Sequence, residues 1–280
     1  MTGTSSYPPS RTRSRATLSS GLLRSRRALH LLCHRHPALD SLPSQKLPHL
    51  PNAWMHYDEI DGNGRTILSR TERFADYHSG FDTLFRAPRL LAALKDLSGE
   101  EMALLKEKVN YRGPGSGGFK AHTDMADYLA TVQGNHLTIM LAVEPATLEN
   151  GCLEIVPGSH KIDIPTNDDM CLTSEWVEQH EWVPVPLRTG ECLIFGSRLA
   201  HRSGANNSPH GRASVYATYN ALSIGDKREE YYAHRRIHWP ATADRIPGKD
   251  YEYGARIYAA GTPMLTVDRV AYSRFGMPVA

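Results

Sequence analysis

Two histidines and an aspartate are the residues of this sequence best suited to metal chemistry. His122 and Asp124 lie two positions apart, so in an extended segment the imidazole and the carboxylate project to the same face. Together with His201 they supply two imidazoles and one carboxylate. On one face of an octahedral ion such a set leaves three positions open, as in non-haem Fe(II) oxygenases. Zinc is the rival metal, although catalytic zinc more often takes three ligands in a tetrahedral site.

Each of these residues also has an ordinary structural interpretation. The chain contains 14 histidines, so a His-x-Asp pair by itself also fits a hydrogen-bonded surface pair. His201 alone fits a core histidine, and Arg212, eleven residues later, alone fits a surface arginine. Taken together, the four residues form an ordered set that predicts a three-ligand metal site with a guanidinium nearby.

The elements that must position these residues are predicted to be helices followed by short strands. Apolar residues recur near a 3.6-residue period over residues 80–97, interrupted by Pro88, which predicts a helical region. Further helices are expected over residues 174–180 and after the last strand, where Asp226 would be the N-cap and Glu229 would complete a capping box. Predicted strands, separated by turns rich in Gly, Pro and Asn, cover residues 102–111, 136–143, 152–156, 182–187, 191–195 and 213–222. This order predicts an α+β protein built around a β-barrel or a double-sheet jelly roll.

The N-terminal segment differs in composition from the rest of the chain. Residues 1–39 contain seven arginines, seven serines and no acid, whereas residues 40–280 contain 25 basic and 30 acidic residues. The acidic balance of the body argues against a nucleic-acid-binding domain. We predict a leader and proline-containing linker over residues 1–50 and one folded domain over residues 51–280. Two interpretations of the leader remain. It fits a disordered segment, which could also result from a mispredicted gene start, and it fits a mitochondrial transit peptide.

Hydropathy and cysteine content limit the location of the protein. No window reaches 18 uninterrupted apolar residues, so we predict no membrane-spanning helix. The four cysteines form no CxxC pair and are too sparse for a disulfide scaffold, which favours a reducing compartment. A cytoplasmic location is favoured, with the mitochondrion as the alternative if the leader is a targeting peptide. The sequence does not indicate an oligomeric state.

Several motifs together resemble one family of oxygenases. From about residue 55 to residue 232 the chain resembles the phytanoyl-CoA dioxygenase superfamily of Fe(II)/2-oxoglutarate oxygenases, and it is most similar to the 2-aminoethylphosphonate dioxygenase type. The superfamily motifs are residues 121–124 (AHTD), 149–161 (ENGCLEIVPGSHK), 189–191 (TGE) and 201–212, and the type is matched by residues 109–111, 117–119, 201–206, 219–220 and 226–232. The resemblance implies a double-stranded β-helix (jelly-roll, cupin-like) core with flanking helices, Fe(II) as cofactor, and 2-oxoglutarate and O2 as cosubstrates.

The resemblance also assigns roles to individual residues. The implied iron ligands, which are also the catalytic residues, are His122, Asp124 and His201. Arg212 would bind the distal carboxylate of 2-oxoglutarate, since a guanidinium fork fits a carboxylate bidentately, and Ser203 would donate to the same carboxylate. Asn110 and Phe119 match positions that line the cosubstrate pocket in the similar ectoine hydroxylases.

The function implied is hydroxylation of a C–H bond in a small polar molecule, driven by decarboxylation of 2-oxoglutarate to succinate and CO2. Asp124 favours hydroxylation over halogenation, because related halogenases lack this carboxylate. Substrate-side groups would include Met125, Asp127, Tyr128 and Asn220. Two alternatives remain: an oxygenase of the same family that acts on an acyl-CoA or a natural product, and a non-catalytic barrel that binds a metal or a small ligand. Intact Arg212 and Ser203 weigh against the second. The identity of the substrate and the position of oxidation are not indicated.

Overall fold

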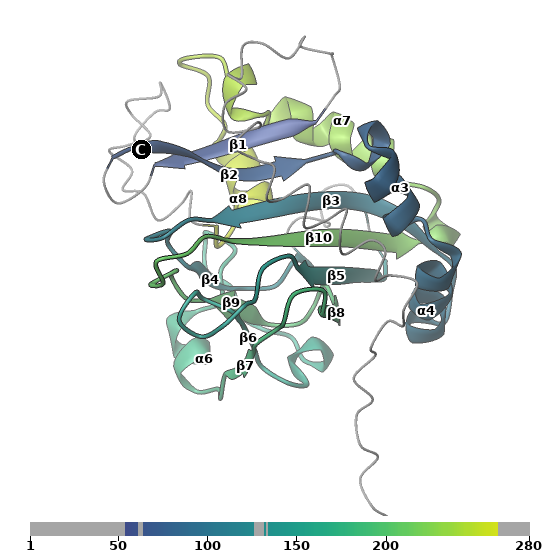
Figure 1. Ribbon diagram of the computed structural model, residues 1–280, viewed down its shortest axis with the longest axis horizontal. Helices are drawn as coiled ribbons and strands as arrows, with labels where there is room; N and C mark the ends of the chain where they lie inside the picture. Colours follow the sequence, from purple (N-terminus) through teal and green to yellow (C-terminus); the bar gives the residue numbers. More distant parts are fainter. Residues whose placement is uncertain (1–53, 61–63, 126–131, 133, 263–280) are drawn as a thin grey trace, which may run out of the picture.

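The computed structural model describes residues 54–60, 64–125, 132 and 134–262, and it has the expected α+β architecture with two antiparallel sheets (Figure 1). The six-stranded sheet has the order β1 (Met55–Ile60), β2 (Thr66–Glu72), β3 (Met102–Arg112), β10 (Arg212–Ala221), β5 (His136–Ala142) and β8 (Cys192–Gly196). The four-stranded sheet has the order β4 (Phe119–His122), β9 (His201–Ser203), β6 (Leu153–Ile155) and β7 (Val183–Val185). Together they form the predicted jelly roll.

The central pair of long strands, β3 and β10, has one apolar face and one polar face. In their antiparallel register Ala213 lies opposite Tyr111 and Val215 lies opposite Val109, and these side chains belong to the largest hydrophobic cluster. The alternate positions are polar on both strands. Their opposed pairs are Arg212 with Arg112, Ser214 with Asn110, Tyr216 with Lys108, and Thr218 with Lys106. Because side chains alternate between the two faces of a strand, these eight residues share one face, which we call the inner face.

The apolar face is covered by the helical region that the sequence predicts. Pro88 divides this region into α3 (Ser79–Phe85) and α4 (Pro88–Ser98), as proline must, because it fits the first turn of a helix but not its interior. Phe81 and Phe85 of α3 and Leu94 of α4 pack in the cluster that contains Val215. A short 3₁₀ turn, η1 (Ala75–Tyr77), leads into α3. Helices α3 and α4 therefore cover the outer, apolar face of the sheet, opposite the face that carries the site.

Other elements also match the predicted positions, with one correction. Helix α6 (Ser174–Glu178) lies where a helix is predicted. Helix α7 (Arg228–His238) follows the last strand, but its N-cap is Lys227, which makes no side-chain capping bond. The capping-box prediction is wrong: Asp226 accepts a bond from the Arg228 N–H one residue outside the cap. The Glu229 carboxylate instead forms an ion pair with Arg73 in the loop after β2. This carboxylate is therefore not available to accept a hydrogen bond from the N-cap N–H, as a capping box requires.

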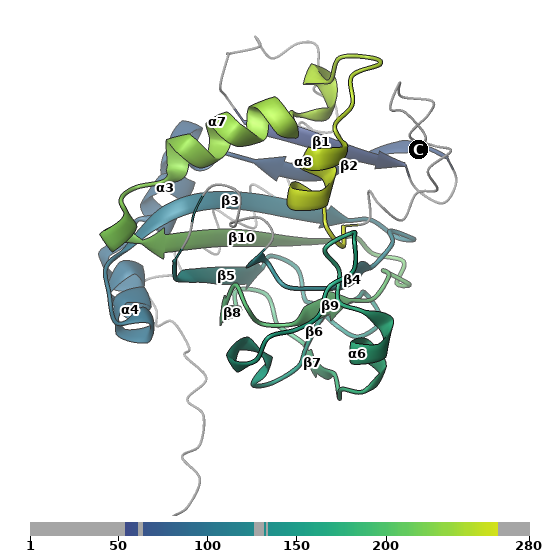
Figure 2. The ribbon, with the colours of Figure 1, turned by 180° about the vertical axis from the view of Figure 1, so that it is seen from behind.

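Helices α7 and α8 (Glu252–Tyr258) lie across β1 and β2, as Figure 2 shows from behind. Their aromatic residues Tyr231, Tyr232 and Tyr258 form a second buried cluster with Tyr57 of β1. The remaining 3₁₀ turns are η2 (Ser159–Lys161), η3 (Leu222–Ile224) and η4 (Thr242–Asp244). Within the described ranges, no helix combines the length and the apolar character needed to cross a membrane. The predicted leader and linker, residues 1–50, lie outside the described residues.

Candidate metal and cosubstrate site

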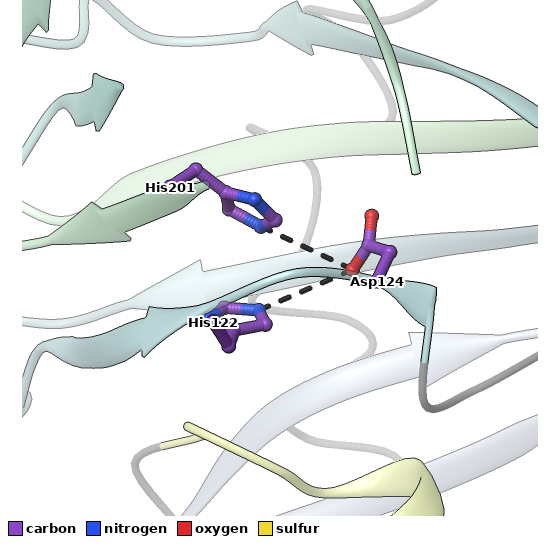
Figure 3. Close-up of side chains that lie close together, drawn as sticks. All are labelled: His122, Asp124 and His201. Atoms are coloured by element: carbon purple, nitrogen blue, oxygen red, sulfur yellow. Dashed lines mark ion pairs between the residues drawn. The ribbon is translucent and has the colours of Figure 1, made fainter. Parts of the chain in front are cut away.

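The three predicted metal ligands lie together between the two sheets (Figure 3). The Nε2 atom of His122 is 4.0 Å, and that of His201 is 3.9 Å, from Oδ1 of Asp124. His122 ends β4 and His201 begins β9, and the two residues are paired in the sheet, which brings together positions 79 residues apart. Since ligand bonds to such ions are about 2.0–2.2 Å long, one ion between these atoms can contact all three.

Backbone carbonyls fix the orientation of both imidazoles. Nδ1 of His122 is 2.7 Å from the Lys120 carbonyl oxygen, and Nδ1 of His201 is 2.9 Å from that of Leu199. A carbonyl only accepts hydrogen bonds, so each Nδ1 carries the proton and each Nε2 presents a lone pair toward Asp124. Burial, reinforced by the neighbouring His201, lowers the pKa of His122 to about 3, so this ring is neutral near pH 7 and able to bind a metal.

Asp124 is held just beyond the end of β4. Its backbone N–H donates to the Ser197 carbonyl at 2.9 Å, which places the carboxylate beside the two rings. Burial alone raises the pKa of this carboxylate, but His201, Lys108, Lys106 and His122 together hold it well below its usual range. The group is therefore ionised, as a metal ligand must be.

Glycine allows the chain to approach His122 from behind. Gly261, which follows α8, has φ +67°, and a Cβ on it would lie 2.9 Å from Nδ1 of His122. Its carbonyl accepts the Lys120 N–H at 2.8 Å. The segment after α8 thus supports β4 at the metal-ligand end. No local sequence pattern indicates this contact, because Gly261 lies more than 130 residues along the chain from His122.

Beside the triad, the inner face lines a pocket with about 480 Å³ of empty space, part of which is open to solvent. Residues predicted to bind the cosubstrate are among those that line it: Asn110, Phe119, Ser203 and Arg212. Oγ of Ser203 accepts the Phe119 N–H at 3.3 Å, and the Arg212 guanidinium donates to Oγ of Ser214 and to the Gly151 carbonyl. Nε of Arg212 has no hydrogen-bond partner in the described part of the chain, although it is buried.

The conformation of Gly151 explains the Asn150-Gly151 pair in the longest sequence motif. Gly151 has φ +73°, and a Cβ there would lie 2.2 Å from the Gly204 carbonyl oxygen, so only glycine fits. This close approach brings the carbonyl of Gly151 within 2.9 Å of Nη2 of Arg212. The motif therefore helps to position the arginine that faces the pocket.

A second arginine, Arg112, also lines the pocket, and it was not predicted from the sequence as a site residue. Arg112, opposite Arg212 in the register, donates from Nη2 to the Gly204 carbonyl and lies over the Phe119 ring. Its Nε and Nη1 are buried and find no hydrogen-bond partner among the residues described here. Burial and the nearby Arg212 lower the pKa of Arg112 to about 10. Buried donors without partners are uncommon in folded proteins, so two such arginines in one pocket fit an anionic ligand.

Asn110 is oriented by a buried chain of charged groups. Nε of Arg70 on β2 donates to Oδ1 of Asn110 at 3.0 Å, which leaves the amide N–H groups of Asn110 to other partners. Arg70 also pairs with Glu72, and Glu72 pairs with Arg235 of α7. All four side chains are at least nine-tenths buried, so the chain connects α7 to the pocket through the interior.

The predicted substrate-side residues have separate locations. Asn220 is buried at the end of β10, where its amide donates to the Ala221 and Gly225 carbonyls, and it is not among the residues that line the pocket. Met125 follows Asp124, and its Sδ lies 3.3 Å from Oγ of Ser197. Asp127 and Tyr128 lie outside the described residues.

Comparison with known proteins assigns the family. A family model described as phytanoyl-CoA dioxygenase (PhyH) matches residues 42–214. The chain belongs to this family. It is a 2-oxoglutarate-dependent non-haem iron dioxygenase, with Fe(II) as its metal and 2-oxoglutarate as its cosubstrate.

Similar proteins carry related names. A 2-aminoethylphosphonate dioxygenase of an uncultured bacterium (HF130_AEPn_1) is 34% identical over 216 residues, which cover 76% of this chain and 82% of that protein. A methylphosphonate hydroxylase of Gimesia maris is 39% identical over 184 residues, 65% of this chain and 70% of that one. The crystal structure of EctD from S. alaskensis with 2-oxoglutarate and 5-hydroxyectoine matches with a TM-score of 0.59 at 19% identity, covering 75% and 71% of the two chains. At that identity the structural match supports the fold.

Proposed function

We propose that this dioxygenase hydroxylates a C–H bond of a small polar molecule while 2-oxoglutarate is decarboxylated to succinate and CO2. The observation that carries the proposal is the common location of the His122, Asp124 and His201 side chains and the Arg212 guanidinium, which face one pocket. A metal triad alone fits a binding protein. A triad beside buried, unsatisfied guanidinium donors fits an enzyme that uses a dicarboxylate cosubstrate.

In this proposal each residue of the chain has a definite task. His122, Asp124 and His201 hold Fe(II), which supplies the oxidising chemistry when 2-oxoglutarate and O2 are bound. The Lys120 and Leu199 carbonyls keep the protons on the Nδ1 atoms, so that both Nε2 atoms stay available to the metal. Ionised Asp124 would supply the negatively charged ligand, and its presence favours hydroxylation over halogenation.

The cosubstrate is bound by the arginine end of the pocket. Arg212 and Ser203 bind the distal carboxylate of 2-oxoglutarate, and Asn110 and Phe119 line the same part of the pocket. Because Arg212 is fixed by Ser214 and Gly151, its guanidinium is oriented before the ligand arrives, which lowers the entropic cost of binding. A distal carboxylate bound there would leave the keto-acid end of 2-oxoglutarate free to reach the metal, because the triad lines the same pocket.

Small organophosphonates are the first substrates to test, because relatives covering most of the chain are named for acting on them. The test measures succinate formed from 2-oxoglutarate by the Fe(II)-loaded protein, with and without methylphosphonate or 2-aminoethylphosphonate, and identifies the product by ³¹P NMR. We expect succinate and a hydroxylated product in a 1:1 ratio with at least one substrate. Failure of any small polar substrate to stimulate succinate release in an iron-loaded, 2-oxoglutarate-binding protein would contradict the proposal.

A further inference from the structure

The inner face of β3 continues beyond the cosubstrate residues as a row of cations. Lys106, Lys108, Asn110 and Arg112 occupy alternate positions on this strand and so point to the same side. Arg112 and Asn110 lie at the end with Arg212 and Ser214, whereas Lys108 and Lys106 lie opposite Tyr216 and Thr218. At about 3.4 Å per residue, Lys108 is roughly 14 Å from Arg112 along the strand. The two lysines therefore lie apart from the arginine pair.

Lys108 belongs to the same pocket as the metal triad. It lines the pocket together with His122, Asp124 and Tyr216, and its Nζ lies 5.2 Å from the centre of the Tyr216 ring. Lys106 is 5% exposed, and its Nζ lies 5.3 Å from the centre of the Tyr231 ring. Both ammonium groups are thus held over aromatic faces on the inner side of the sheet, where charge is only weakly screened by water.

Among the described residues that line the pocket, cations outnumber carboxylates. Three cations, Lys108, Arg112 and Arg212, face one carboxylate, Asp124, so the described lining has a net charge of +2. Ferrous iron adds two positive charges and the 2-oxoglutarate dianion adds two negative ones, so the loaded pocket again carries +2. In the layer behind, Arg70 and Arg235 pair with Glu72, which lies opposite Lys108 on β2. The buried Glu59 carboxylate also acts on Arg112 from β1, so two arginines and two carboxylates leave this layer without net charge.

A pocket that remains positive after its metal and cosubstrate are bound is complementary to an anionic third ligand. A neutral substrate leaves the excess unchanged and a monocarboxylate removes half of it. A tetrahedral dianion removes all of it and offers several acceptor oxygens to lysine donors. Because the same pocket must also hold 2-oxoglutarate, the two ligands share the space beside the triad.

We propose that Lys108, supported by Lys106, forms the subsite for a dianionic tetrahedral headgroup of the primary substrate, a phosphonate or a closely similar oxyanion, and thereby sets which C–H bond lies at the metal. The assignment rests on the proposed hydroxylase function and names the residues that select its substrate. The position of Lys108 fits this role. Its side chain lines the pocket from β3 together with the metal triad, and it lies four residues along the strand from Arg112, which pairs with Arg212.

The test measures binding as well as turnover. Methylphosphonate, 2-aminoethylphosphonate and inorganic phosphate are titrated calorimetrically, without oxygen, into the full-length protein loaded with Fe(II) and 2-oxoglutarate. Three variants are compared with the unaltered protein: Lys108→Met, which keeps the apolar stem, Lys108→Arg, which keeps the charge, and Lys161→Met, a control at an exposed lysine outside the pocket. The affinity for 2-oxoglutarate is measured in each.

Truncating one member of a buried charge pair costs about 30-fold or more in affinity. We expect that loss for phosphonate with Lys108→Met, substantial recovery with Lys108→Arg, no change with Lys161→Met, and a 2-oxoglutarate affinity altered less than about threefold. Equal phosphonate affinity in Lys108→Met and the unaltered protein would overturn the assignment. Absence of binding of all three probes to the unaltered protein would also overturn it, while leaving a hydroxylase of another substrate class intact. Lys108-dependent phosphonate binding without any hydroxylated product would instead support the subsite and contradict the proposed function.

Discussion

The two faces of β3 and β10 show how one pair of strands serves stability and chemistry separately. The outer positions, such as Val109 and Val215, are apolar and pack under α3 and α4. The inner positions, such as Arg112 and Arg212, are equally buried but charged. Burial of the first kind stabilises the fold at about 25 cal/mol per Å², whereas burial of a charge is costly unless a partner offsets it.

The difference is clearest where donors lack partners. The outer face presents few polar atoms, and the buried Glu107 on that side is satisfied by Arg228 and by the Ala75 N–H. On the inner face, Nε and Nη1 of Arg112 and Nε of Arg212 have no partner within the described structure. We therefore expect ligands to complete the arginine end of the inner face, whereas the protein itself completes the outer face. Substitutions on the two faces are expected to separate binding from stability.

The largest effect is expected at the metal. His201→Ala removes one of three ligands, and since changes in residues that merely orient a ligand already cost about 10–100-fold in metal affinity, we expect a loss of Fe(II) affinity above about 100-fold. Anaerobic Fe(II) titration measures it. His160→Ala, at an exposed histidine of η2, is the matched control and is expected to bind Fe(II) normally. Normal binding by His201→Ala would remove His201 from the site.

Neighbouring residues of β10 offer the sharpest comparison of the two faces. Val215→Ala removes buried methyl groups from the outer cluster, and we expect the free energy of unfolding to fall by about 2 kcal/mol with an unchanged affinity for 2-oxoglutarate. Ser214→Ala removes the acceptor of an Arg212 hydrogen bond, so a weaker affinity for 2-oxoglutarate with a smaller loss of stability is expected. Urea unfolding and calorimetry measure the two quantities. The reverse pattern would contradict the division between faces.

The sequence predicted the long elements and the motif residues better than the pocket as a whole. Strands β3, β5 and β10 were located because runs of seven to eleven residues carry a clear pattern between turn residues. Strand β9, with three residues, is too short to carry one, and β1 and β2 were not anticipated. Arg112 and Lys108 were missed although they lie two residues on either side of Asn110, where the same-face rule applied to His122 and Asp124 would have found them. The support from Gly261 and Arg70 depends on tertiary packing and leaves no local pattern.

A pH effect is expected from a buried histidine of β5. Burial, reinforced by Lys106, lowers the pKa of His136 to about 4, below its ordinary value of about 6.5. Between these values the unfolded chain binds a proton that the folded one does not, so stability falls as the pH falls, by up to about 1.4 kcal/mol per pH unit. Urea midpoints between pH 7 and pH 4.5 measure the slope. His136→Gln is expected to reduce it, with His160→Gln as the exposed control, and an unchanged slope in His136→Gln would exclude this cause.

The smallest effect is expected at the N-terminus. The family model begins at residue 42, and residues 1–39 contain none of the residues of the site. Deleting residues 1–39 is therefore expected to leave the melting temperature and succinate formation unchanged. A thermal scan and a succinate assay of the shortened chain measure both. A marked loss of stability would show that this segment packs against the domain.

The central claim is that the inner face binds 2-oxoglutarate through Arg212 beside the metal triad, and anaerobic titration of 2-oxoglutarate into Fe(II)-loaded Arg212→Ala tests it most directly. Loss of a buried charge partner predicts an affinity at least about 30-fold weaker than that of the unaltered protein, with Fe(II) affinity nearly unchanged. Arg212→Lys is expected to recover only part of the loss, because an ammonium cannot reproduce the two-pronged geometry. An affinity close to that of the unaltered protein in Arg212→Ala would contradict the claim.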